Sequence, residues 1–168
     1  MKKTLLIAAF ASLTMASAQA TLFSFSLDLN GLNEVPTTPS AGIGIGTATW
    51  DSDTSVLTMS GTFTGLLAPT SAAHIHTGVA GANGPVLVGI TFSNFATSGT
   101  FSYSGTAVDT AGEINALFAG GLYVNIHTLE FPGGEIRGQL TPVPEPETYA
   151  MIAGAGLVGF GVFRRFRR

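Results

Sequence analysis

The strongest constraint on the fold is an alternation of apolar and polar residues with a period of two. It is clearest over residues 23–30, where Phe23, Phe25, Leu27 and Leu29 alternate with Ser, Ser, Asp and Asn. Successive side chains of a β-strand point to opposite faces, so the spacing predicts a strand with one buried face. A chain with such strands must bury that face against other strands.

Similar stretches follow at short intervals and are separated by Gly, Pro, Asn and Asp. A hairpin is predicted around residues 51–54, with Leu57, Met59 and Phe63 of its second strand pointing inward. The nearly all-apolar run 86–92 predicts a strand buried on both faces. The strands expected after residue 30 cover residues 43–51, 56–65, 72–77, 86–92, 100–105, 122–128 and 134–141.

A single helix is predicted over residues 110–119. Thr110 and Glu113 have the spacing of a capping box, and Gly120-Gly121 supplies a stop signal. Many short strands with almost no helix predict a mainly β, antiparallel fold, a Greek-key-like sandwich or flattened barrel with one short helix.

Charge excludes one class of partner. Residues 21–142 keep Arg137 as their only Lys or Arg beside eight acidic residues, a formal charge of −7. Nucleic-acid binding relies on clustered Lys and Arg, so we expect no nucleic-acid partner. The chain has no cysteine, and its stability must come from burial rather than from disulfides.

The first twenty residues have the pattern of a signal peptide. A cationic Met1-Lys2-Lys3 precedes the apolar stretch Leu5 to Met15, and Ala18-Gln19-Ala20 is an A-x-A cleavage site. We expect export through the Sec machinery, cleavage after Ala20 and a mature domain over residues 21–142.

The C-terminus combines a proline spacer, residues 142–147, with an apolar stretch that ends in Arg164-Arg165-Phe166-Arg167-Arg168. A helix from Tyr149 to Phe163 would be about 22 Å long, against about 30 Å of hydrocarbon, and is short for a permanent span. The arginines should stay cytoplasmic.

This order of elements over residues 143–168, with Pro144, Glu145 and Pro146 as the motif, resembles the PEP-CTERM sorting signal of Gram-negative bacteria. The resemblance implies attachment to the inner membrane through the helix, recognition by an exosortase and cleavage near the motif. It also implies delivery to the cell surface or extracellular matrix, where polysaccharide or protein is the expected partner. The alternative is a permanent tail anchor.

A second resemblance concerns the domain itself. Asn33-Glu34-Val35-Pro36, Ala73-His74-Ile75-His76, Tyr123-Val124-Asn125-Ile126-His127 and Gly134-Glu135-Ile136-Arg137-Gly138 follow one another in the order of the CHRD domain first described in chordin. The resemblance implies a small extracellular β-domain and no particular chemistry.

All three histidines lie in these motifs. On a strand His74 and His76 face the same side, about 7 Å apart at their roots, and His127 joins them if its strand is a neighbour. Three imidazoles suit copper or zinc. The alternative is a structural role, in which the histidines bond backbone and carboxylates in a polar seam.

A weaker similarity is to copper–zinc superoxide dismutase, a Greek-key barrel with His-x-His and later His strands. Arg137 would correspond to that family's anion-guiding arginine. The chain lacks a fourth histidine and both cysteines of that family. Glu135 and Arg137 share a face, and we expect Arg137 to pair with Glu135, Glu34 or Asp28. An exposed Arg137 beside the histidines would instead indicate an anion site.

From the residues alone, the leading interpretation is an exported, non-enzymatic binding or structural module without a cofactor. Its alternatives are a mononuclear copper or zinc site with redox activity and a permanently membrane-anchored surface protein.

Overall fold

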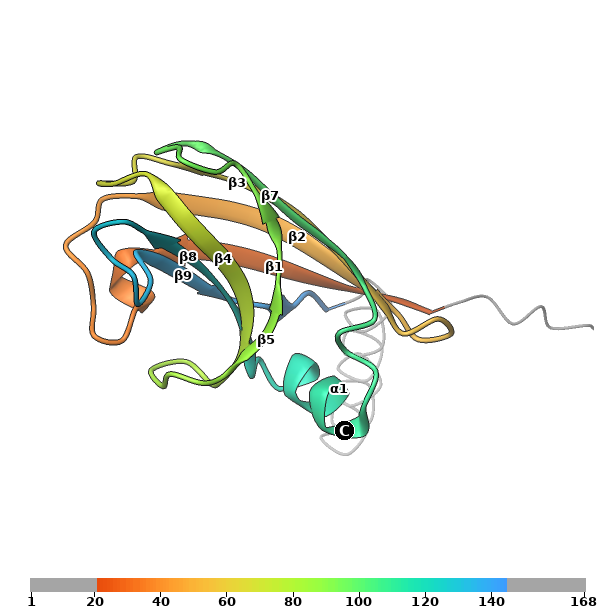
Figure 1. The fold of residues 1–168 in the computed structure, drawn as a ribbon. Helices are drawn as coiled ribbons and strands as arrows, with labels where there is room; N and C mark the ends of the chain where they lie inside the picture. Colours follow the sequence, from red (N-terminus) through yellow and green to blue (C-terminus); the bar gives the residue numbers. More distant parts are fainter. Residues whose placement is uncertain (1–20, 145–168) are drawn as a thin grey trace, which may run out of the picture.

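Antiparallel strands make up most of the regular structure in the computed structural model, which describes residues 21–144 (Figure 1). The predicted mainly β fold with one short α-helix is confirmed. The elements are β1 (Leu22–Asn30), η1 (Gly31–Asn33), β2 (Ile43–Asp51), β3 (Val56–Thr64), β4 (Thr70–Thr77), β5 (Val86–Gly89), β6 (Thr91–Phe92), β7 (Gly99–Gly105), α1 (Ala111–Phe118), β8 (Leu122–Thr128), β9 (Ile136–Gln139) and β10 (Thr141–Pro142).

The strands form one curled sheet in the order β5-β4-β8-β9-β1-β2-β3-β7-β6, and β10 also pairs with β1. Its two edge strands, β5 and β6, are separated in sequence only by Ile90. The Ile90 N–H donates to Ala73 O of β4 at 3.0 Å, whereas the next residue, Thr91, pairs with Ser102 of β7. The chain therefore steps from one edge to the other and nearly closes the sheet into a barrel.

This crossing corrects the prediction of one strand, 86–92, buried on both faces. Val86 and Gly89 are exposed, Leu87 and Val88 are half-buried, and only Ile90 is buried. The run is apolar because Leu87, Val88 and Phe92 pack against the core at the point where the barrel closes, and Ile90 is part of that core. The predicted strand 134–141 is likewise divided into β9 and β10.

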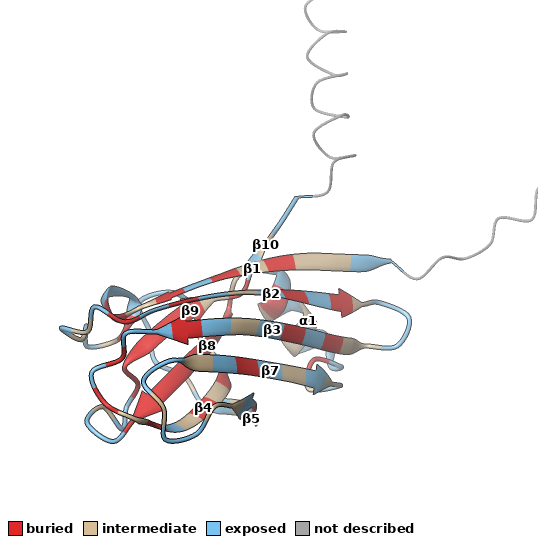
Figure 2. Ribbon diagram, turned by 90° about the horizontal axis from the view of Figure 1, so that it is seen from above, coloured by how far each residue is buried: buried red, intermediate tan, exposed pale blue. Residues whose placement is uncertain are grey.

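The core confirms the period-two pattern of β1. Phe25, Leu27 and Leu29 are no more than 2% exposed, and Phe23 is half-buried. The predicted inward residues of β3, Leu57, Met59 and Phe63, are also buried. In Figure 2 buried and exposed residues alternate along β2, β3 and β7, as one covered and one solvent-facing side requires.

Helix α1 begins with the predicted capping box: Thr110 accepts from the Glu113 N–H, and the Glu113 carboxylate accepts from the Thr110 N–H. Gly120 follows it with a φ of +66°, a conformation that favours glycine. Phe118 at its end packs edge-on against Phe23 and Trp50. The helix thus covers the aromatic end of the barrel.

Several expectations lie outside the described residues. They are the signal peptide of residues 1–20 with its cleavage at Ala20, the motif residues Glu145 and Pro146, and the apolar helix 149–163. Within residues 21–144 no helix is long and apolar enough to cross a membrane.

Candidate metal centre on the outer face of the sheet

The predicted site residues lie on the outer face of β4, β8 and β9, not inside the barrel. On β4, Ala73 and Ile75 enter the core, so His74 and His76 point outward. On β8 the core takes Leu122, Val124 and Ile126. The outward residues of β8 and β9 are Tyr123, Asn125, His127, Arg137 and Gln139.

Loops make this outer face a buried polar layer. The loops 31–42, 78–85 and 129–135 gather at one end of the barrel (Figure 1). Carbonyls of the second and third loops bond to the outward side chains of His76, His127 and Arg137, and Asn33 of the first donates to the backbone carbonyl of Arg137. All seven residues of β8 are buried, although only alternate ones face the core.

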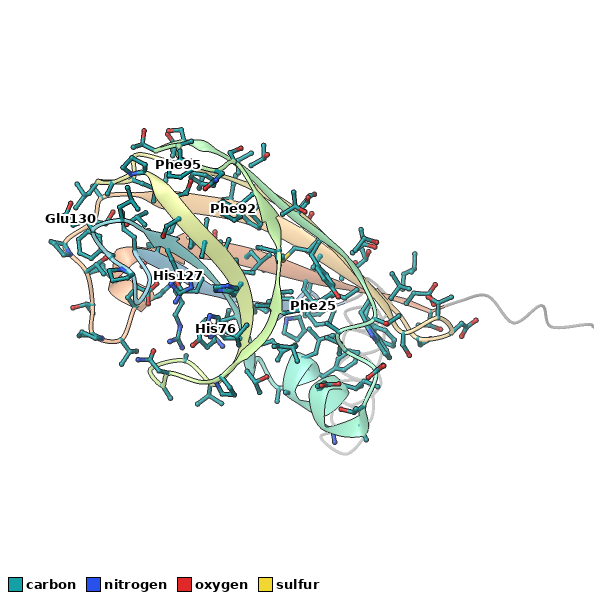
Figure 3. The ribbon with its side chains drawn as sticks, viewed as in Figure 1. Phe25, His76, Phe92, Phe95, His127 and Glu130 are labelled. Carbon is teal, nitrogen blue, oxygen red and sulfur yellow. The ribbon has the colours of Figure 1, made fainter. Side chains whose placement is uncertain are left out.

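The three histidines come together because β4 and β8 are neighbours. His74 lies opposite Asn125 and Ala72 opposite His127, which places His127 diagonally beside His74. His74 Nδ1 is 3.0 Å from His127 Nε2, and one ring nitrogen from each of the three lies within 4.8 Å of the others. His76 and His127 are close to each other beside the β4–β5 loop (Figure 3).

Backbone carbonyls orient two of these rings. His76 Nδ1 lies 3.0 Å from Gly84 O, and His127 Nδ1 lies 2.9 Å from Pro132 O. A carbonyl only accepts, so each Nδ1 carries the proton and each Nε2 presents a lone pair. Within residues 21–144, His76 Nε2 is buried and has no hydrogen-bond partner.

Burial also favours the neutral form of His74 and His127. It lowers the pKa of His127 to about 4, although the bond to Pro132 O opposes it, and charge on His74 and His76 lowers that pKa further. Burial, followed by charge on His76, lowers the pKa of His74. Neutral imidazole is the form that binds metal.

The donor set fits a borderline metal ion. Three nitrogens with one position left open are found at catalytic and transport sites for zinc and copper, and carbonyl bonds to the distal ring nitrogen are their usual support. Nitrogens on a tetrahedral zinc lie roughly 3.3 Å apart. His74 and His127 nearly satisfy this, and modest ring rotation would close the 4.8 Å span. The half-buried His74 marks the side open to solvent.

Arg137 is 1% exposed and binds the loop beside the histidines. It donates to Val79 O, Ala82 O and Asn83 Oδ1 at 2.9–3.2 Å, and its guanidinium lies 3.6 Å above the Tyr123 ring. None of the hydrogen bonds found within residues 21–144 joins it to a carboxylate. Its hydrogen-bond partners are therefore not the predicted acids, although its charge acts on Glu34, and its burial argues against an anion site.

Glu135 is fully buried and has partners of its own. It accepts from Ser40 Oγ and the Leu67 N–H at 2.6 Å and from Thr128 Oγ1 at 2.8 Å. Three segments far apart in sequence thus share one carboxylate, which is the reason that Glu135 and Arg137 do not pair although they are only two residues apart.

Sequence reasoning missed the residues that support the histidines. Tyr123 stacks on His76, with ring centroids 4.9 Å apart and planes at 10°, and its hydroxyl accepts from the Gly84 N–H. The polar residues alternating within the apolar strand 122–128 were a signal that its outer face is also covered. No local signal marked Asn83 and Gly84, which resemble any turn.

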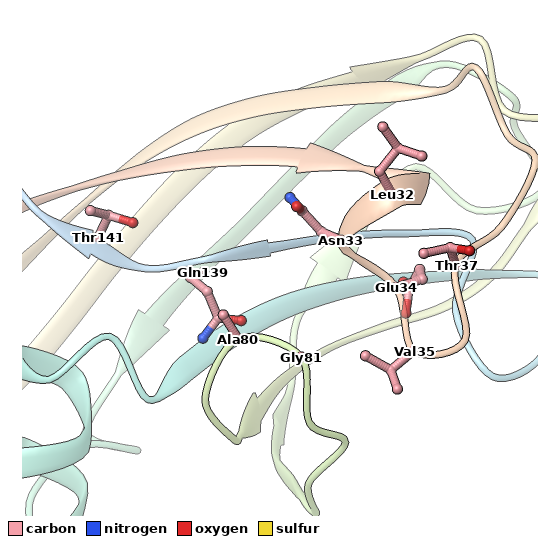
Figure 4. A pocket seen from close by; sticks show the side chains of 9 residues that line it. All are labelled: Leu32, Asn33, Glu34, Val35, Thr37, Ala80, Gly81, Gln139 and Thr141. Carbon is pink, nitrogen blue, oxygen red and sulfur yellow. The ribbon is translucent and has the colours of Figure 1, made fainter.

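The sequence indicated Glu34 only as a possible partner of Arg137, and the structure shows that Glu34 is itself an unusual buried acid. It is 4% exposed, its Oε1 has no hydrogen-bond partner among the described residues, and burial raises its pKa to about 7, although the charge of Arg137 opposes the shift. It lines a pocket between segment 32–37 and Ala80-Gly81, with Gln139 and Thr141 also at its wall (Figure 4).

Comparison with known families agrees with this architecture. The model of the CHRD domain matches residues 25–140, and that of the PEP-CTERM protein-sorting motif matches residues 142–168. No curated protein and no solved structure matches the chain. The matched residues include every buried residue of the hydrophobic core and all three histidines. The chain therefore belongs to the CHRD-domain family and carries a C-terminal PEP-CTERM sorting motif.

Proposed function

We propose that this exported protein, sorted by an exosortase, binds one copper or zinc ion through His74, His76 and His127 and acts as a binding module of the cell surface or matrix. The sorting motif implies export and exosortase processing. Cleavage near Pro144 and release from the inner membrane belong to the proposal.

The observation that carries the metal site is the unpartnered His76 Nε2. A buried ring nitrogen without a hydrogen bond costs free energy, and native structures rarely tolerate it without a reason. Here the Gly84 carbonyl fixes the ring, and one ring nitrogen from each of the three histidines lies within 4.8 Å of the others. A metal ion would satisfy it.

The geometry favours binding over catalysis. Two of the three histidines are 8% exposed, and the only cation of the domain, Arg137, is engaged by loop carbonyls rather than turned to an open site. A substrate anion would therefore find no free side-chain cation beside the metal ion among the described residues. This supports a role in holding a metal ion.

The test is metal titration of the domain of residues 21–144, which contains the whole described core. A ligand bound only by the folded state raises the melting temperature, by roughly 10 °C when its concentration is 100 times Kd. We expect this with Cu(II) or Zn(II), and nitrogen hyperfine splitting in the Cu(II) electron paramagnetic resonance spectrum.

Two variants separate this site from adventitious binding. His76→Ala should abolish the increase, whereas Asp53→Asn, which removes an exposed hairpin carboxylate, should retain it. Equal melting temperatures with and without metal in the unsubstituted domain would leave the histidines a structural role only.

The processing step has its own measurement. The intact mass of the mature protein from its native host should correspond to a chain that begins at Thr21 and ends near the sorting motif. A mature chain that still ends at Arg168 would contradict exosortase cleavage and support a permanent anchor.

A further inference from the structure

The outer face of β2, β3 and β7, on the side of the barrel away from α1, is covered by hydroxyl groups. Nine of its eleven exposed outward residues are Thr or Ser, and the other two are Ile43 and Ile45. We call these nine the hydroxyl face: Thr47, Thr49, Thr58, Ser60, Thr62, Thr64, Thr100, Ser102 and Ser104. Figure 2 shows exposed positions recurring along β2, β3 and β7.

Strand register arranges the hydroxyl face in rows. Thr47, Ser60 and Ser102 lie opposite one another across the three strands, and the next row contains Thr49, Thr58 and Ser104. Neighbouring strands are about 4.8 Å apart, and alternate residues on a strand about 6.8 Å. The face is thus a regular grid of donors and acceptors.

Most of this hydrogen-bonding capacity is free for a partner. Among the described residues, Thr58 Oγ1 lies 3.3 Å from Ser104 Oγ within the face, and at its border Thr64 Oγ1 lies 3.0 Å from Ser98 Oγ and Thr100 Oγ1 lies 3.4 Å from Ser93 Oγ. The other five hydroxyls of the face have no hydrogen bond within residues 21–144. Along the β2–β3 pair, two hollows of about 130 and 120 Å³ lie one after the other, bordered by residues 43–45 with 62–64 and by residues 47–49 with 58–60. Each is too small to enclose a ligand. We call the line of these two hollows the β2–β3 track.

The residue types on this face exclude most partners. Protein interfaces rely on Trp, Tyr and Arg, and none of the eleven outward residues is aromatic or charged. Nucleic acids and anionic membranes need Lys or Arg. The acids of the domain repel polyanions. Two of them lie on or beside these strands: Asp28 of β1 pairs with Ile45, and Asp51 ends β2, where its carboxylate accepts from hairpin amides.

A partner that matches the face is extended, uncharged and itself rich in hydroxyls. We propose that the hydroxyl face binds a neutral linear polysaccharide laid along the β2–β3 track. Each hydroxyl contact is weak, and repetition along the grid and along the polymer supplies the affinity. This proposal is independent of the metal centre, which lies on β4 and β8.

The experiment is sedimentation of the domain of residues 21–144 with microcrystalline cellulose, with alginate beads as the polyanionic comparison and with chelator present throughout. We expect retention on cellulose and none on alginate. The variant Thr47→Glu/Ser102→Glu places two carboxylates in the central row and should reduce retention at least tenfold.

A matched control is Ala111→Glu/Asn115→Glu, which adds the same charge on exposed positions of α1. It should sediment like the unsubstituted domain. All substituted positions are exposed, so melting curves should show folded protein. Absence of retention on cellulose, preference for alginate, or equal retention of the two double variants would overturn the proposal.

Discussion

At the scale of single residues, three buried polar side chains organise the outer face of the sheet. Arg137 holds the loop that supplies Gly84 O to His76. Glu135 joins Ser40, Leu67 and Thr128. One carboxylate oxygen of Glu34 has no hydrogen-bond partner within residues 21–144. Arg137 and Glu135 connect loops and strands through hydrogen bonds rather than through ion pairs.

Replacing Arg137 by lysine should lower the free energy of unfolding by about 2–4 kcal/mol, because an ammonium cannot reach all three loop acceptors and leaves buried groups unsatisfied. Urea denaturation measures the loss. Asn83→Ala supplies the control in a double-mutant cycle. It should cost about 1 kcal/mol alone and less beside Arg137→Lys. Full additivity would contradict the hydrogen bond between Arg137 and Asn83.

Glu34 and His127 should give opposite pH dependences in the metal-free domain. Burial raises the pKa of Glu34 from 4.5 to about 7, so the folded chain keeps a proton that the unfolded chain releases, and stability falls as the pH rises across this range. Burial lowers the pKa of His127 from 6.5 to about 4, so stability rises with pH between these values. The two effects nearly cancel where they overlap.

Glu34→Gln should expose the histidine contribution. Its free energy of unfolding should match the unsubstituted domain below pH 4.5, increase with pH up to 6.5, and exceed it by up to about 3 kcal/mol above pH 7. Chemical denaturation at several pH values measures this. Parallel pH profiles of the two proteins would show that Glu34 ionises as it does in the unfolded chain.

At the scale of elements, local signals and packing agree for α1. Its capping box satisfies amides at the first turn, and its last residue, Phe118, contacts Phe23, Phe25 and Trp50. The helix is only eight residues long, too short to be stable alone. Its stability therefore depends on both the cap and the aromatic contact.

Thr110→Ala should lower the free energy of unfolding by about 1 kcal/mol, because the Glu113 N–H loses its acceptor. Thermal denaturation followed by far-ultraviolet circular dichroism measures the change. The exposed Thr106 lies four residues earlier, and Thr106→Ala should change stability by less than about 0.5 kcal/mol. Equal losses in both variants would show that the cap contributes nothing specific.

At the scale of the whole molecule, closure is the weakest part of the barrel. Strand β8 lies between β4 and β9 and all its residues are buried, whereas β6 has two residues and β5 four, with Ile90 between them. Few buried contacts and exposed backbone are the marks of a segment that opens locally.

Amide hydrogen exchange should reveal this difference. We expect the amides of residues 86–92 to exchange at least tenfold faster than those of β8 in the folded domain, because the junction of β5 and β6 opens without global unfolding. Only global unfolding should release β8, so its exchange should track the free energy measured with denaturant. Equal protection from exchange in residues 86–92 and in β8 would mean that the β5–β6 junction is as stable as the interior strands of the sheet.

Much of the fold follows from short-range pattern. The alternation in residues 23–30 determined β1 and its inward face, and Thr110 with Glu113 determined the start of α1. His74 and His76 share a face because any strand repeats every two residues. These features depend on neighbours within a few positions, and the sequence contains that information directly.

Pairing between distant segments was decided only by the tertiary structure. Whether His127 meets His74 depends on β8 lying beside β4, and the partners of Arg137 depend on how the loop 78–85 folds over β9. The run 86–92 reads as a buried strand, yet its position at the β5–β6 junction exposes half of it. These outcomes depend on which strands pair with each other. Strand pairing is decided by competition among contacts between residues far apart in sequence, and local periodicity contains no information about it.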